Sequence, residues 1–147
     1  MQKISNEQAI EQILQNDPRY PKDAYEFVRH ALDFTMKKFK KNTPAKDQHI
    51  TGKELLDGIR EYALQQFGPL AYTVLKHWNL SKCEDIGNMV FNMVDMQILK
   101  KTEHDSREDF KGGYDFEEAF RRPFEPPYST PQRLVGLPTK ASSTKLS

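Results

Sequence analysis

The sequence predicts a mainly α-helical protein with a winged-helix-like core and a C-terminal tail. Apolar residues recur at helical spacing through five segments between residues 10 and 94. Capping-box patterns precede three of these segments, and proline or glycine ends several of them. Beyond residue 120, prolines and Ser/Thr residues replace the helical pattern. We therefore expect one helical domain over residues 1–120 and a disordered tail over residues 121–147.

Two N-terminal helices are expected within residues 1–41. Ser5 and Gln8 form a capping box, and Pro18 ends the first helix because proline lacks a backbone N–H. The second helix covers residues 22–40 and buries a stripe from Ala24 to Phe39. Four lysines crowd its end: Lys37, Lys38, Lys40 and Lys41. We interpret them as solvated complements of the helix dipole, with a phosphate-contacting patch as the alternative.

The winged-helix-like core is predicted over residues 50–120. Thr51 and Glu54 cap its first helix, which Gly68 ends, and a short helix from Pro69 follows. A third helix begins after Ser81 with a third capping box. Gly87 within this helix predicts the close approach of a neighbouring helix.

A strand over residues 98–102, a hairpin around Gly112 and a last helical turn at Phe116 and Phe120 complete the expected order. Helix, short helix, turn, helix and hairpin is the order of a winged helix-turn-helix. The third helix would be the recognition helix, but its acidic side chains would repel phosphates. This charge favours protein binding over DNA binding.

Composition and charge set the expected environment. The net charge is +1, but five basic residues and one acidic residue follow residue 120, so the tail carries +4 and the body −3. One cysteine excludes an intramolecular disulfide and fits a reducing compartment. Because no signal peptide or transmembrane run is present, we expect a cytoplasmic protein that does not enter membranes.

The sequence predicts no catalytic residue, metal or cofactor. The four histidines show no ligand spacing, and Cys83 has no nearby cysteine. Cys83 at a helix start could have a lowered pKa, although a lone helical cysteine is more often a small core residue. The acidic residues from Glu103 to Asp109 could bind a cation or act as an acid/base pair. We favour pairing of one carboxylate with Arg107 and solvation of the rest.

This reasoning predicts a non-enzymatic protein-interaction module that binds a protein partner. The methionines of the third helix are core filler or an adaptable groove, and the 105–116 loop is the second candidate surface. The candidate partner-binding residues are Met89, Met93, Met96, Asp105, Arg107, Asp109, Phe110 and Tyr114. The alternative is an RNA- or ribosome-associated protein that uses its basic tail. The candidate nucleic-acid contacts are Arg121, Arg122, Arg133 and Lys140.

Several motifs follow one another in a recognisable order. They are DPRY at 17–20, AYEFV at 24–28, ITGKELLDGIREYA at 50–63, QFGP at 66–69, VFN at 90–92, and DSREDF through YDF at 105–116. In these motifs the chain resembles an uncharacterised hypothetical-protein family restricted to Verrucomicrobia and Planctomycetes, over about residues 4–120. The resemblance implies a bacterial cytosolic origin and no known activity. Asn79 departs from the glycine expected after the tryptophan, but asparagine tolerates the same left-handed conformation.

Overall fold

A computed structural model describes residues 4–44, 49–99 and 107–125. Within these ranges the chain is mainly helical, as predicted, and no residue lies in a β-strand. The α-helices are α1 (Asn6–Asn16), α2 (Lys22–Phe39), α3 (Gly52–Phe67), α4 (Ala71–His77) and α5 (Cys83–Asp95). The shorter elements are the 3-10 turns η2 (Gly68–Leu70), η3 (Arg107–Phe110) and η5 (Arg122–Phe124), and the π-helical turn η4 (Glu117–Arg121).

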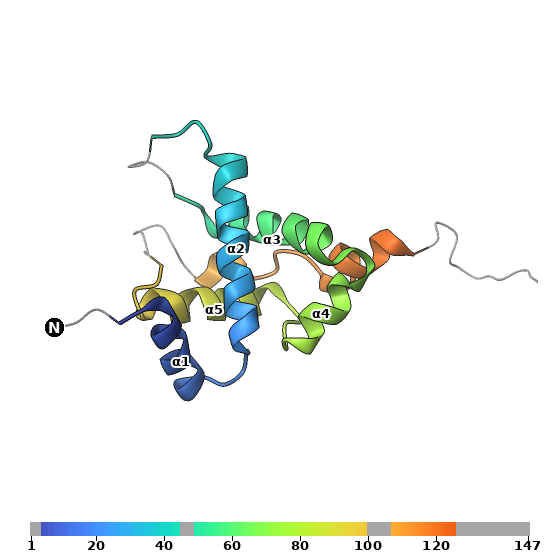
Figure 1. Ribbon diagram of the computed structural model, residues 1–147. Coiled ribbons are helices and arrows are strands. Elements are labelled where there is room, and N and C mark those ends of the chain that lie inside the picture. Colours follow the sequence, from blue (N-terminus) through green and yellow to red (C-terminus); the bar gives the residue numbers. More distant parts are fainter. Residues whose placement is uncertain (1–3, 45–48, 100–106, 126–147) are drawn as a thin grey trace, which may run out of the picture.

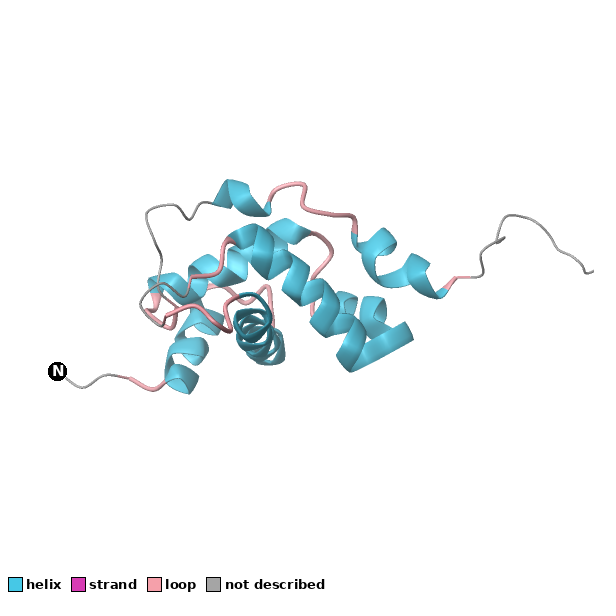
Figure 2. Cartoon of the chain, turned by 90° about the horizontal axis from the view of Figure 1, so that it is seen from above, coloured by secondary structure: helices cyan, strands magenta, loops and turns pink. Residues whose placement is uncertain are grey.

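Helices α3 and α5 form the middle of the fold. Helix α2 stands across them in Figure 1, and the segment 107–125 lies on their opposite side, as the view from above shows (Figure 2). Helix α1 packs on α2 and α5, and α4 packs on α3. Buried residues from every α-helix join one hydrophobic core, whose largest fully buried side chains are Tyr20, Tyr25 and Phe120.

Two of the three predicted capping boxes are confirmed. The Ser5 hydroxyl accepts from the Gln8 N–H at 3.1 Å, and the Thr51 hydroxyl accepts from the Glu54 N–H at 3.0 Å. The third box was predicted in the wrong register, because α5 begins at Cys83 with Lys82 as the capping position. There Asp85, not Glu84, accepts from the backbone N–H of Lys82.

Helix α2 follows its predicted stripe up to Thr35, but Phe39 at its end is 41% exposed. Two of the lysines near this end reach α3. Lys38 forms an ion pair with Glu61, and Lys40 lies 3.5 Å from Glu54. These pairs connect the end of α2 to α3. Each lies at the surface and contributes little to the stability of the fold by itself.

Two glycines let other elements approach the middle helices closely. A Cβ on Gly58 of α3 would lie 1.7 Å from Oγ1 of Thr35 on α2. A Cβ on Gly87 of α5 would lie 3.0 Å from the Phe110 side chain. The sequence predicted a neighbouring helix at Gly87, but the close neighbour is an aromatic ring on the short turn η3.

The predicted wing is not observed in the described part of the chain. Ile98 and Leu99 form a turn, and residues 100–102 of the expected strand lie outside the described residues. Gly112 adopts a left-handed φ of +60°, but a 3-10 turn and an irregular stretch flank it, not paired strands. Phe110 and Phe116, on the two sides of this turn, are both buried in the core. Phe110 lies beside Gly52 of α3 and Gly87 of α5. The segment therefore packs on these helices without forming a wing, and the winged-helix prediction is not supported.

The helical part also continues past the predicted boundary at residue 120. Turns η4 and η5 run to Phe124, and Pro123 occupies an early position of η5 where a missing N–H is tolerated. Arg121 pairs with Glu117, and Arg122 with Glu118, both at the helical spacing of four residues.

Candidate functional site

The predicted partner-binding loop is only partly at the surface. Asp109 and Tyr114 line one surface pocket of about 220 Å³, together with Lys53 and Asp57 of α3. Phe110, by contrast, is 4% exposed. Arg107 begins η3, and Asp105 lies outside the described residues.

Tyr114 and Cys83 are both held by hydrogen bonds within the protein. The Tyr114 hydroxyl donates to the Leu56 carbonyl at 2.8 Å, and the Cys83 thiol donates to the Tyr114 carbonyl at 3.6 Å. Burial raises the pKa of Cys83 to about 11 and raises that of Tyr114 well above its usual value. The alternative of a lowered Cys83 pKa is therefore wrong, because burial disfavours the charged thiolate.

Of the three methionines in and directly after α5, two are buried in the core. Met89 and Met93 have no exposed surface and belong to the core, whereas Met96 packs against the core and is half-buried. A partner could reach Met96 in this conformation but neither of the other two.

Two of the four predicted nucleic-acid contacts lie in the part of the chain that the structure describes. Arg121 and Arg122 are exposed and paired with Glu117 and Glu118. Arg133 and Lys140 lie outside the described residues.

The polar face of α5 turns inward to the loop between α1 and α2. Asp85 accepts from the Tyr20 hydroxyl at 2.7 Å and from the Ser81 N–H at 2.9 Å. Asn88 donates to the Tyr20 oxygen at 3.0 Å, and Asn92 donates to Asp17 at 2.9 Å. Asp85, Asn88 and Asn92 of the supposed recognition helix are thus used within the protein.

One carboxylate of this network, that of Asp17, is paired with a cation. Arg19 donates to both carboxylate oxygens of Asp17, at 2.8 and 2.7 Å, and these bonds hold the pKa of Asp17 well below its usual range. Burial raises the pKa of Tyr20 to about 12, so its hydroxyl remains a donor to Asp85. We interpret this network as a structural connection between the N-terminal helices and the rest of the fold.

Four aromatic rings from α2, α3 and the end of α4 gather on a different part of the surface. Phe27 of α2 lies in their middle, and its ring centroid is 5.5 Å from that of Tyr62, 5.6 Å from Phe67 and 5.4 Å from Trp78. Phe67 and Trp78 also meet edge to face at 5.8 Å. Phe27 is buried, whereas the other three rings are half-buried.

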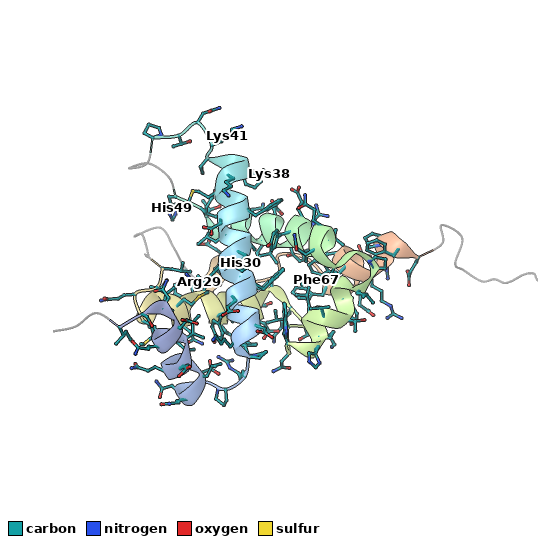
Figure 3. The ribbon with its side chains drawn as sticks, viewed as in Figure 1. Arg29, His30, Lys38, Lys41, His49 and Phe67 are labelled. Atoms are coloured by element: carbon teal, nitrogen blue, oxygen red, sulfur yellow. The ribbon has the colours of Figure 1, made fainter. Side chains whose placement is uncertain are left out.

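A surface pocket of about 200 Å³ opens beside these rings, and we call it the aromatic pocket. Its polar lining comes from Asp23, Glu26, His30 and Gln66. His30 lies on α2 and Phe67 at the end of α3, and both are labelled in Figure 3. The pocket therefore combines aromatic rings with two carboxylates one helical turn apart on α2.

This pocket was not predicted from the sequence. Only the crossing of α2 and α3 and the return of α4 bring the rings together.

Two further properties concern only the residues described. No group of three or more His, Cys, Asp or Glu side chains there is placed to hold a metal ion. No helix in the same ranges is both long enough and apolar enough to cross a membrane.

Comparison with known proteins assigns no family to the chain. A scan of family models, a search of curated proteins and a search of solved structures each return no match. The resemblance to the family from Verrucomicrobia and Planctomycetes therefore stays a prediction.

Proposed function

We propose that this protein is a non-enzymatic protein-interaction module whose docking surface is the aromatic pocket. The observation that carries the proposal is the group of half-buried rings of Tyr62, Phe67 and Trp78 around the buried Phe27. Tyrosine and tryptophan are enriched where proteins bind one another, because they supply large rigid surfaces with a polar edge.

The size of the pocket supports docking of a single side chain. Pockets for whole small molecules commonly measure roughly 300–1,000 Å³, whereas the aromatic pocket measures about 200 Å³. Anchoring of one side chain from a partner, surrounded by weaker contacts, is the usual organisation of a protein interface.

Site-specific photo-crosslinking in cells tests this proposal. A photoreactive amino acid replaces Gln66, an exposed residue that lines the pocket, and in a matched control it replaces Glu11, an exposed residue of α1. The proposal predicts a discrete protein adduct from position 66 that is absent from position 11. Equal adducts from both positions, or no adduct from position 66, would contradict it.

A further inference from the structure

We infer that the aromatic pocket binds the ammonium group of a lysine side chain, methylated or unmodified, on the partner protein. This inference rests on the proposed function and names the chemistry that the pocket recognises. Its basis is the juxtaposition of aromatic rings with the carboxylates of Asp23 and Glu26.

The rings supply the first attraction for a cation. An aromatic face carries a partial negative charge, and a cation within about 6 Å of the ring centroid is attracted to it, most strongly by tryptophan. Tyr62, Phe67 and Trp78 surround Phe27 at centroid distances of 5.4 to 5.6 Å. All four rings line the pocket, so a group of ammonium size seated in it would meet several rings together.

The carboxylates supply the second attraction and exclude an anion. Glu26 lies 3.9 Å from the ammonium group of Lys22, and both side chains are about two-fifths exposed. Asp23 is exposed and has no ion-pair partner among residues 4–44, 49–99 and 107–125. An incoming ammonium group would complement this excess negative charge, whereas a phosphate or carboxylate would be repelled.

The chain carries its own probe for this binding. Trp78 is the single tryptophan of the sequence, so intrinsic fluorescence of the full-length protein reports on the pocket. We would titrate the protein with three amino acids blocked as N-acetyl methylamides: lysine, Nζ-trimethyl-lysine and the neutral norleucine. Sodium chloride at matched ionic strength controls for a general salt effect.

The expected result is saturable binding of at least one lysine form, with affinity about 2- to 30-fold above that for norleucine. Asp23→Asn should weaken lysine binding and leave norleucine unchanged, whereas Asp33→Asn, an exposed change elsewhere on α2, should have no effect. Phe67→Leu should also weaken binding, and Phe34→Leu is its control, because Phe34 contacts Tyr62 outside the pocket lining. Thermal melts identify any variant that fails to fold. Asp23→Asn changes an exposed side chain and still tests the inference if Phe67→Leu does not fold.

Equal affinity for lysine and norleucine would overturn the inference and indicate an apolar anchor. Absence of any saturable response would overturn it as well. If crosslinking at position 66 still captures a discrete protein, only the cation preference fails and the interaction module stands. If crosslinking fails too, the proposed function falls with it.

Discussion

The hydroxyl of Tyr20 donates a 2.7 Å hydrogen bond to the carboxylate of Asp85, which is 65 residues away in the chain and 8% exposed. This contact attaches the loop between α1 and α2 to the start of α5. The same carboxylate accepts from the backbone N–H groups of Ser81 and Lys82, at 2.9 and 3.2 Å. One buried side chain thus caps a helix and joins two distant parts of the fold.

Tyr20→Phe should destabilise the protein by about 1.5–3 kcal/mol, because a buried carboxylate loses a hydrogen-bond donor. Tyr25→Phe is the matched control, since its hydroxyl accepts a bond from neutral Asn92. It should cost only about 0.5–1.5 kcal/mol. Urea denaturation measures both values. A larger loss of unfolding free energy for Tyr25→Phe than for Tyr20→Phe would contradict the conclusion that Asp85 joins these two parts of the fold.

Asp17→Asn should change how stability depends on pH. The bonds from Arg19 lower the folded-state pKa of Asp17 below its usual value of 3.8. Its contribution is therefore fully present above that value and is lost as pH falls through the folded-state pKa. The difference in unfolding free energy between wild type and variant should be constant near neutral pH and should shrink below about pH 4. A difference in unfolding free energy that grows on acidification would contradict this prediction.

Gly58→Ala should destabilise the protein although alanine is the better helix former. The added Cβ would collide with Oγ1 of Thr35, and overpacking of this kind costs about 1–3 kcal/mol. Thr35→Ala in the same chain removes the colliding oxygen, so the double variant should lose less than the sum of the single losses. Strict additivity in thermal or urea unfolding would show that α2 and α3 do not cross as described.

The Cys83 thiol should resist alkylation in the folded protein. It is 1% exposed, and its pKa of about 11 keeps it protonated at pH 8. Iodoacetamide labelling, followed by mass spectrometry, should therefore proceed at the rate of unfolding and accelerate with urea. Rapid labelling of the native protein at pH 8 would show that the thiol is accessible.

The sequence predicts those features of this fold that depend on near neighbours. The Ser5 and Thr51 capping boxes involve residues three apart, and Asn79 adopts its expected left-handed conformation with φ of 66°. Such signals are local, so one sequence suffices to find them.

Features that depend on distant contacts were predicted wrongly or missed. The glycine pair at 112–113 suggested a hairpin, but the burial of Phe110 against Gly87 determines the path of that segment. The partner of Asp85 is Tyr20, which no periodicity within α5 indicates. The aromatic pocket likewise forms only when α2, α3 and α4 have packed.

The most direct test of the docking pocket is a map of amide and indole chemical shifts in the full-length, ¹⁵N-labelled protein during titration with blocked Nζ-trimethyl-lysine. The account predicts that the largest changes centre on Phe27, Tyr62, Phe67 and Trp78, including the indole N–H of Trp78. Changes concentrated at Asp109 to Tyr114, or no changes at all, would contradict it.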